Sequence, residues 1–460
     1  MINRPQAYQP ETAILELGEG FYDPAEAADF PETRLRFRND RAAASVGLEG
    51  LSDPEWVSHF GRFVPMEGSL PQPLALRYHG HQFRVYNPEI GDGRGFLFAQ
   101  MRDDRDRLMD LGTKGSGRTP WSRFGDGRLT LKGGVREVLA TEMLEALGVE
   151  TSRSFSLIET GEALERGDEP SPTRSAVLVR LSHGHIRIGT FQRLAYERDE
   201  DGMRRLIAYV LRHYYGEDAG DGDAVDDAAV RLLRHVVART AKLAASYMAA
   251  GFVHGVLNSD NINVTGESFD YGPWRFAPTW DPGFTAAYFD HAGLYAFGRQ
   301  PEAIHWDAMQ LAVALRLVSE APPLIAVLDA FGEQYQPAVS GAILWRLGVR
   351  PLDAETDRKL VQAIEGGLRA EGASIDQFFF DGFGGVLPES YGAGFDEARM
   401  LLAGYRARAA RDHGYWHGAP CSMLIDEVEA IWSAIDQRDD WSVFEARIAS
   451  IREMGAALIA

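Results

Sequence analysis

The segment from His254 to Asp270 holds the side chains with the clearest chemical potential. Asn261 lies in a short polar run after His254-Gly255, and Asp270 begins the sequence Asp270-Tyr271-Gly272. An amide oxygen and a carboxylate are hard ligands of the kind that Mg²⁺ shares with nucleotide phosphates. Asp260, directly before Asn261, adds a carboxylate that could accept a proton. The segment therefore predicts a metal-bound nucleotide beside an acidic group.

A second group of residues suits the phosphates of a nucleotide. Lys114 ends a predicted strand, and Glu137 lies in the first half of the next predicted helix. A lysine that neutralises phosphates needs a carboxylate to hold it, and protein kinases pair a strand lysine with a helix glutamate for this purpose. Two unrelated surface charges are the alternative.

Arg180 and Arg187 flank the run Ser182-His183-Gly184-His185. Guanidinium forks match phosphate oxygens, and two of them in one region of an acidic chain suggest a local positive pocket. Structural salt bridges to the many carboxylates are the alternative for either arginine.

Glycines at Gly91, Gly93 and Gly95 stand just before a predicted strand. The missing side chains would let backbone N–H groups approach a phosphate. A plain tight turn is the alternative, because short glycine patterns match by chance.

The order of these parts is that of a protein kinase: glycine loop, lysine, helix glutamate, His-Gly loop, asparagine and Asp-Tyr-Gly. One part differs. The position that supplies the kinase base holds Val256, and a valine cannot accept a proton. The ordinary arrangement for passing a γ-phosphate to a hydroxyl is thus missing, and Asp260 is the obvious substitute base.

Strands and one helix are expected to position these residues. Phe96 to Met101 and Leu108 to Lys114 predict two strands joined by a polar turn, and Ala176 to Leu181 predicts a third after the solvated loop Glu165 to Arg174. Apolar residues at helical spacing from Val135 to Leu147 predict a helix that ends at Gly148.

From Met203 onward the pattern is mainly helical. The acidic stretch from Gly216 to Asp227 predicts a surface loop, and Ala228 to Ala250 predicts a long buried helix. We therefore expect an α+β, bilobal, protein-kinase-like fold. Its expected parts are an N-terminal extension on the first lobe (1–75), a strand-rich lobe (76–195) and a helical lobe with the catalytic and metal-binding loops (196–460).

Composition narrows the class of protein. The 460 residues include 47 basic and 67 acidic side chains, a formal charge of -20. Nucleic acids and anionic membrane surfaces bind proteins that carry a positive charge, so neither is an expected partner of this acidic chain. The single Cys421 cannot form an intramolecular disulfide, and no secretory signal is visible, so the expected compartment is the cytoplasm.

Other patterns favour plain structural roles. The pairs His79/His81 and His183/His185 could suggest zinc, but no cysteine-rich motif or His-Glu-x-x-His helix accompanies them. Cys421 is better interpreted as a small buried hydrophobe than as a nucleophile. The aromatic residues after Asp270 are expected to pack in the core: Trp274, Phe276, Trp280 and Phe284.

Several segments together resemble the selenoprotein O family, also called YdiU. The Lys114 block is the most specific of them, and the resemblance extends from about Tyr78 to Pro301. The segments are Tyr78-His79-Gly80-His81-Gln82-Phe83, Gly91-Asp92-Gly93-Arg94, Lys114-Gly115-Ser116-Gly117-Arg118-Thr119-Pro120-Trp121-Ser122-Arg123-Phe124-Gly125-Asp126-Gly127-Arg128, His254-Gly255-Val256-Leu257-Asn258-Ser259-Asp260-Asn261 and Asp270-Tyr271-Gly272-Pro273.

The resemblance implies a pseudokinase-like enzyme that binds ATP inverted and transfers AMP to Ser, Thr or Tyr hydroxyls of proteins, releasing pyrophosphate. It implies Asp260 as proton acceptor, Asn261 and Asp270 as ligands of Mg²⁺ or Mn²⁺, and Glu137 as support for Lys114. The implied nucleotide contacts are Gly91, Gly93, Arg94, Lys114, Asp126, Gly127, Arg180, Arg187 and Asp270.

The chain departs from the family pattern at its end, which carries no selenocysteine or cysteine tail. Redox control through an internal disulfide is therefore not expected. Two further functions stay open at this point. Asp260 could serve conventional phosphoryl transfer, or the protein could bind nucleotide as a scaffold without turnover.

Overall fold

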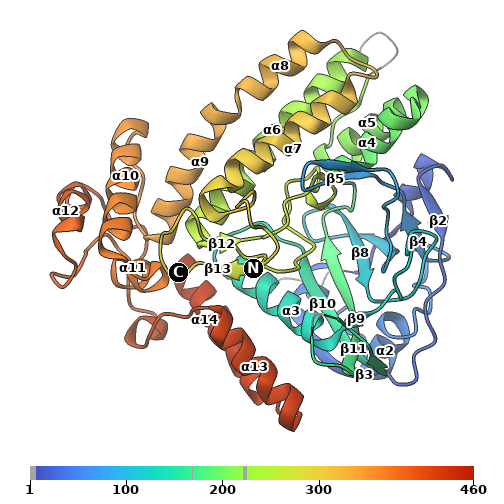
Figure 1. Cartoon of the computed structure of the whole chain (residues 1–460), viewed down its shortest axis with the longest axis horizontal. Coiled ribbons are helices and arrows are strands. Elements are labelled where there is room, and N and C mark those ends of the chain that lie inside the picture. Colours follow the sequence, from blue (N-terminus) through green and yellow to red (C-terminus); the bar gives the residue numbers. More distant parts are fainter. Residues whose placement is uncertain (1–6, 168, 221–224) are drawn as a thin grey trace.

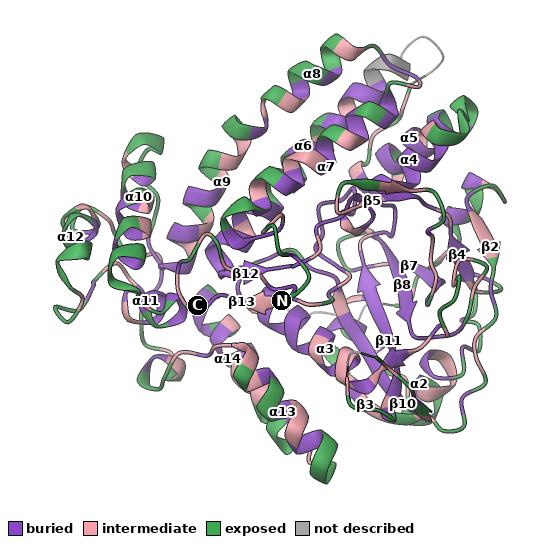
Figure 2. Ribbon diagram, in the orientation of Figure 1, coloured by how far each residue is buried: buried purple, intermediate pink, exposed green. Residues whose placement is uncertain are grey.

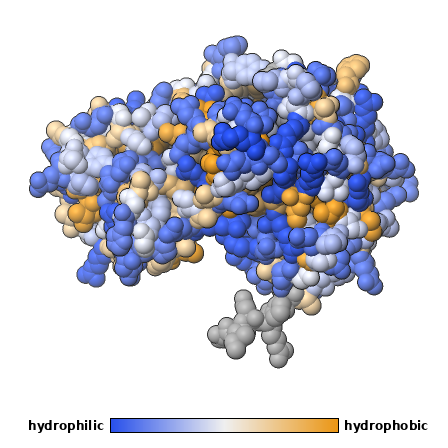
Figure 3. Space-filling model, turned by 90° about the horizontal axis from the view of Figure 1, so that it is seen from below, coloured by the Kyte–Doolittle hydropathy of each residue, from blue (hydrophilic) through white to orange (hydrophobic). Residues whose placement is uncertain are grey.

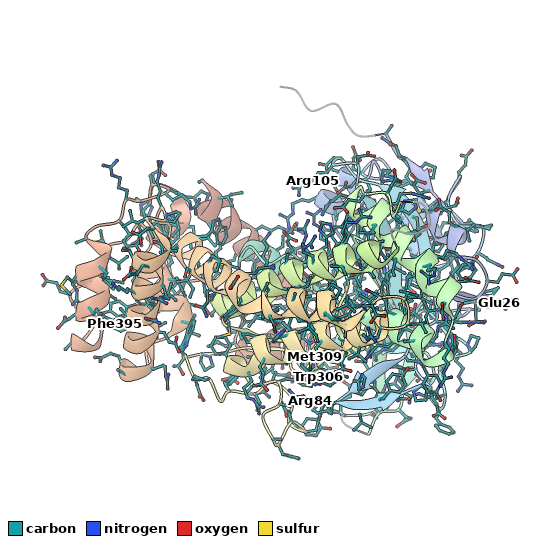
Figure 4. The ribbon with its side chains drawn as sticks, turned by 90° about the horizontal axis from the view of Figure 1, so that it is seen from above. Glu26, Arg84, Arg105, Trp306, Met309 and Phe395 are labelled. Carbon is teal, nitrogen blue, oxygen red and sulfur yellow. The ribbon has the colours of Figure 1, made fainter. Side chains whose placement is uncertain are left out.

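The computed structural model describes residues 7–167, 169–220 and 225–460, without the side chains of 225–227. Within these residues a strand-rich part precedes a mainly helical part (Figure 1). Figure 4 places Glu26 at the strand-rich end and Phe395 at the opposite, helical end. This is the predicted α+β arrangement, and it is compatible with a bilobal protein-kinase-like fold.

In the described ranges nine strands form one antiparallel sheet, in the order β2-β4-β7-β8-β11-β10-β3, with β1 beside β7 and β9 beside β11. Two short antiparallel pairs, β5–β6 and β12–β13, lie outside it. The strands are β1 (Pro10–Glu11), β2 (Tyr22–Pro24), β3 (Arg34–Arg38), β4 (Leu74–Leu76), β5 (Gly80–Gln82), β6 (Val85–Asn87), β7 (Leu97–Arg102), β8 (Leu108–Lys114), β9 (Leu129–Thr130), β10 (Arg153–Leu164), β11 (Thr173–Ser182), β12 (Phe252–Val253) and β13 (Arg275–Phe276).

The predicted hairpin that ends at Lys114 is confirmed. Asp103 closes its turn by accepting the backbone N–H groups of Arg105 and Arg107 at 3.0 and 2.8 Å. Strand β8 has the predicted bounds, and β7 is one residue displaced from the prediction. Strand β11 is longer than predicted because both its ends pair with neighbours. This sheet brings Lys114 and Arg180 onto adjacent strands.

Helix α3 (Leu131–Ala146) crosses one face of the sheet, against β10 and β11. Thr130 caps its start by accepting the Gly133 N–H at 3.1 Å, and Gly148, with a φ of +78°, follows its end as predicted. Eleven of its residues, Glu137 included, are buried. The helix therefore presents Glu137 toward the sheet and Lys114.

Residues before 75 cover the other face and also belong to the sheet. Helices α1 (Asp40–Ser45) and α2 (Asp53–Phe60) lie over β10 and β3, where the Trp56 ring stacks on Phe155 at 4.8 Å. Strands β1, β2 and β3 come from the same segment. This segment is thus both a cover for the sheet and a source of three of its strands.

The helical part is organised around α6, which packs along α7 and α9 (Figure 1). Helix α6 begins at Val225, three residues earlier than predicted, and positions 221–224 of the predicted acidic loop lie outside the described residues. Figure 2 shows buried residues along both α6 and α7, which contact each other. The remaining helices are α4 (Ile188–Glu197), α5 (Glu200–Tyr215), α7 (Gln300–Leu315), α8 (Ala321–Asp329), α9 (Phe331–Arg346), α10 (Ala354–Glu371), α11 (Ile375–Asp381), α12 (Asp396–Leu402), α13 (Ile425–Arg438) and α14 (Ser442–Ile459), with α6 ending at Ala250.

The last two helices return to the strand-rich part. Helices α13 and α14 lie beside α3 (Figure 1), and α14 makes the larger contact. Arg452 of α14 donates two hydrogen bonds of 2.8 Å to the carboxylate of Glu142 in α3. The chain end therefore supports the same helix that carries Glu137.

Figure 3 shows a face with mainly hydrophilic residues and scattered apolar ones, in keeping with the acidic composition. Of the helices described, none combines the length and the apolar character that crossing a bilayer requires.

Candidate active site

A polar cavity of about 710 Å³ opens between the sheet and the loop that carries Asp260. Glu137 and Asn261 are not part of its lining, although both are adjacent to residues that are. Ten residues predicted from the sequence line it: Gly91, Gly93, Arg94, Lys114, Asp126, Gly127, Arg180, Arg187, Asp260 and Asp270.

Lys114 lies at the end of β8 with its side chain 4% exposed. Its Nζ is 2.6 Å from Glu137 Oε2, 3.0 Å from Asp270 Oδ1 and 3.3 Å from the Tyr271 carbonyl. The expected contact between Lys114 and Glu137 is therefore formed. It fixes a buried cation at the cavity, where a phosphate could replace one of the carboxylates around it.

Arg180 of β11 and Arg187 at the start of α4 add two buried guanidinium groups. Arg180 Nη1 lies 3.3 Å from Glu137 and 3.5 Å from Asp270. Arg187 contacts Asp92 at 3.2 Å and Asp270 at 3.8 Å. Both hypotheses from the sequence therefore hold in part: the arginines form salt bridges, and with Lys114 they place three buried cations, each beside a carboxylate, at the inner end of the cavity.

Asp270 joins these cations. Its backbone has a φ of +63°, in the left-handed region, which is unusual for a residue other than glycine. Burial alone would raise the pKa of its carboxyl, but Lys114, Arg180 and Arg187 together hold that pKa well below its ordinary range. Asp270 is therefore a carboxylate at neutral pH, as a metal ligand must be.

The segment from His254 to Asp270 is fixed by its own hydrogen bonds. His254 Nε2 is 3.0 Å from the Phe269 carbonyl, and Asn261 Nδ2 donates to the Val256 carbonyl at 3.0 Å. This second bond engages the amide nitrogen of Asn261, so the amide oxygen is the atom that could bind a cation. Val256 offers only its backbone here, in agreement with the missing kinase base.

Asp260 lies on the 3₁₀ turn Ser259–Asn261 and is 7% exposed. Its Oδ1 is buried, with no hydrogen-bond partner among the residues described. Strand β5 covers it so closely that a Cβ at Gly80 would lie 2.7 Å from this oxygen. Burial raises the pKa of Asp260 to about 7, although Arg187 opposes the shift. Asp260 is thus an acid–base group near neutrality.

The β5–β6 hairpin is held over this loop from both sides. The His81 N–H donates to Ser259 Oγ at 2.7 Å, and the Phe83 N–H donates to Asn258 Oδ1 at 3.0 Å. Figure 4 shows Arg84 beside Trp306 of α7, where the guanidinium carbon lies 5.3 Å from the ring centroid. These contacts fix the Asp260 backbone from outside the loop.

Close packing explains why glycine occupies positions in the segment just before β7. A Cβ at Gly91 would lie 2.6 Å from Trp121 Cγ, and one at Gly95 would lie 2.0 Å from the Thr113 carbonyl oxygen. The segment therefore presses against its neighbours, and this close packing leaves Arg94 on the cavity wall.

Asp126 and Gly127 mark the outer end of the cavity. Asp126 forms an ion pair with Arg166 at 2.8 Å. Gly127 has a φ of +71°, and its carbonyl accepts the Gly117 N–H at 3.1 Å. The loop predicted as solvated thus supplies, through Arg166, a partner for a site residue.

Comparisons with known proteins agree with this geometry. The model of the family described as "Protein adenylyltransferase SelO" matches residues 6–383. The chain belongs to this family. It is 44% identical to "Protein nucleotidyltransferase YdiU" of Gloeobacter violaceus, covering 96% of this chain and 95% of the relative. The proteins of the same name from Synechocystis sp. and Synechococcus elongatus are 42% and 53% identical, covering 96% and 74% of this chain and 97% and 68% of theirs.

Membership in the SelO family confirms the resemblance seen in the sequence, and it makes the chain a nucleotidyltransferase. The match reaches beyond Pro301, where the motifs fade, and ends just after α11. Helices α13 and α14 therefore lie outside the part that the family model matches, although they contact α3.

The SelO-family residues at the cavity fit a divalent cation that a nucleotide completes. In the described part of the chain, no three His, Cys, Asp or Glu side chains form a group that could hold a metal by themselves. The buried Oδ1 of Asp260 without a partner, the amide oxygen of Asn261 and the Asp270 carboxylate are all hard oxygen donors. Such donors suit Mg²⁺ or Mn²⁺ with phosphate oxygens as further ligands.

Sequence reasoning missed several residues of this site. Asp92 accepts from Arg187 and also from the Leu76 N–H at 3.1 Å, and the Arg187 guanidinium carbon lies 4.3 Å from the Tyr78 ring centroid. Both belong to quoted motifs without an assigned role. Arg166 gave no signal, because only the fold brings it next to Asp126.

The histidine pairs and the aromatic run have structural surroundings. Trp274, Phe276 and Trp280 are buried as predicted, and Phe284 is partly buried against the cluster that contains Trp280. Cys421 is buried, and burial raises the pKa of its thiol. The four Nδ1 atoms have separate partners: His79 contacts Tyr86 Oη, His81 contacts Gln192, His183 contacts the Leu108 carbonyl and His185 contacts Asp110.

Proposed function

We propose that the protein transfers AMP from ATP to Ser, Thr or Tyr hydroxyls of other proteins and releases pyrophosphate. Three buried cations at the inner end of the cavity, Lys114, Arg180 and Arg187, carry this proposal. The oxygens of a polyphosphate can bind all three in place of or beside their carboxylates, whereas a neutral adenine ring offers them no charge. The base would then lie toward the outer end, with the α-phosphate beside Asp260.

The reaction follows from this orientation. The acceptor hydroxyl oxygen forms a bond to the α-phosphorus, and the bond from that phosphorus to the oxygen bridging to the β-phosphate breaks. The hydroxyl proton passes to Asp260, whose raised pKa suits a base near neutral pH. Pyrophosphate leaves with the electron pair. Lys114, Arg180 and Arg187 stabilise the charge that grows on it.

The other predicted residues have supporting roles in this proposal. Asn261 and Asp270 would hold Mg²⁺ or Mn²⁺, which when bound offsets phosphate charge. Glu137 orients Lys114. The remaining nucleotide contacts would be Gly91, Gly93, Arg94, Asp126 and Gly127, all of which line the cavity.

Partners and location form part of the same proposal. An acidic chain with one buried cysteine is suited to a reducing compartment such as the cytoplasm, and it favours protein acceptors over nucleic acids or membranes. The proposed division is an extension (1–75), a strand-rich lobe (76–195) and a helical lobe (196–460). The second part supplies the phosphate-binding cations, and the third supplies the acid–base group and the metal ligands.

Labelled ATP tests the reaction. The protein is incubated with α-labelled or γ-labelled ATP, Mg²⁺ and a panel of peptides that contain Ser, Thr or Tyr, and products are analysed by intact mass spectrometry. We expect label only from the α position and an added adenylate on the acceptor. Label from the γ position alone would establish phosphoryl transfer. ATP binding without any product would identify a scaffold.

A further inference from the structure

Phe124 is the most exposed large apolar side chain of the described residues, at 103% relative exposure. It nevertheless lines the active-site cavity, on the loop between Lys114 and Arg128. Covering an apolar ring with another flat surface removes it from water and is favourable. An aromatic ring in this place is therefore suited to bind a flat group that enters the cavity.

The backbone around Phe124 is held on both sides. Ser122 Oγ donates to the Gly93 carbonyl at 2.5 Å, and beyond Phe124 the Asp126 carboxylate pairs with Arg166 at 2.8 Å. The ring can therefore change its rotamer while the rest of the cavity wall stays in place.

Trp121, the other aromatic residue of this loop, cannot do the same. Its ring fills the space beside Gly91, and its indole N–H donates to the Asp23 carboxylate at 2.9 Å. Trp121 anchors the loop, so Phe124 is the ring that can move.

We infer that Phe124 closes over the base of the bound nucleotide by stacking on it. This inference rests on the proposed function, because a triphosphate at Lys114, Arg180 and Arg187 directs the base to the outer end, where Phe124 lies. Every base has a π face, so stacking supplies affinity and leaves the choice of adenine to other contacts. Phe124 is thus a positioning residue for the nucleoside.

Calorimetric titration of the full-length protein with ATP and with inorganic tripolyphosphate, both with Mg²⁺, tests the inference. Because Phe124→Ala removes one base stack, we expect this variant to bind ATP about tenfold more weakly than the wild type. Tripolyphosphate has no base, so its affinity should stay the same. Phe124→Tyr should restore ATP binding. Tyr288→Ala, at a residue 78% exposed and outside the cavity lining, is the matched control and should bind both ligands like the wild type.

Two results would overturn the inference: unchanged ATP affinity in Phe124→Ala, or equal weakening for ATP and tripolyphosphate. The ratio of ATP to GTP affinity gives a further readout and should not change, since stacking does not distinguish the bases. These titrations involve no turnover. A lack of AMP transfer would therefore contradict the proposed function without altering their result.

Discussion

Asp260 lies four residues after Val256, which occupies the kinase base position, so the proposed proton acceptor reaches the cavity from a different point of the loop. Replacing Asp260 by Asn keeps the shape and removes the acceptor. We expect AMP transfer to fall by about 100-fold or more, because general base catalysis contributes on that scale. ATP affinity should change little. Wild-type turnover in Asp260→Asn would show that another group takes the proton.

Glu267 is a second buried carboxyl group, outside the active-site cavity. Its Oε2 accepts the His183 N–H at 2.8 Å. Burial raises the pKa of Glu267 from its ordinary 4.5 to about 7, although the His183 N–H and Arg107 oppose the shift. Between those two values the folded protein retains a proton that the unfolded chain loses. This group therefore lowers the free energy of unfolding as pH rises from 4.5 to 7.

Glu267→Gln removes this titration and still offers an oxygen to His183. At pH 8 we expect the variant to exceed the wild type in unfolding free energy by up to about 3 kcal/mol, and at pH 4.5 to be no more stable than the wild type. Urea denaturation at both pH values measures the difference. A constant difference across this range would mean that Glu267 is charged in the folded protein.

At the scale of elements, the stability of α3 depends on a buried network of charged side chains. Glu142 has a side chain only 2% exposed and accepts from Arg452, from Arg41 at 3.1 Å and from Asn39 at 3.3 Å. Glu142→Ala would leave these donors without their shared acceptor, a loss of about 3 kcal/mol or more in unfolding free energy. Chemical denaturation measures it.

Lys132→Ala is the control for this prediction, because it removes a charge pair of the same helix at the surface. Lys132 lies 2.8 Å from Glu429, and both side chains are partly exposed. Exposed pairs contribute little, so we expect a change below about 1 kcal/mol. If both variants lose the same stability, burial of the Glu142 network is not what stabilises α3.

The β7–β8 hairpin, which ends at Lys114, shows how far local sequence determines an element. Strands β7 and β8 are predicted almost to the residue from the apolar run Phe96 to Met101, the polar turn and the returning segment Leu108 to Lys114, because a closed turn fixes the register of both strands. Helix α6 begins at Val225, three residues before its predicted start, which an acidic composition does not reveal.

At the scale of the molecule, the chain end supports the strand-rich part. Asp439, at the end of α13, accepts from Arg174 at 2.7 Å and from Arg36 at 3.1 Å, on β11 and β3. A chain that ends before Ile425 would lose these pairs and expose one side of α3. We expect its melting temperature to fall by at least about 5 °C, with faster hydrogen exchange in residues 131–146.

The rate of hydrogen exchange in α10 is the internal reference for the truncated chain, because α10 packs against α9 and α12 and not against α3. Slow exchange in α3 that survives the truncation would contradict a supporting role of α13 and α14. Weaker AMP transfer is expected in parallel, since α3 carries Glu137.

The sequence by itself determined the types and order of the parts. Lys114, Glu137, Asn261 and Asp270 could be named because chemistry restricts which side chains bind phosphates and metals, and because periodicity is a local property. The same reasoning identified Val256 as a residue that cannot be a base. These conclusions need no contact between distant segments.

Only the tertiary structure decided which charges meet and how strongly they interact. Arg166 reaches Asp126 across 40 positions, and Gly80 covers Asp260 from a hairpin 180 positions away. Ionisation depends on burial and on neighbouring charges, which exist only in the folded chain. That is the physical reason why the chemistry of Asp260 could be suspected from its sequence but its environment could not.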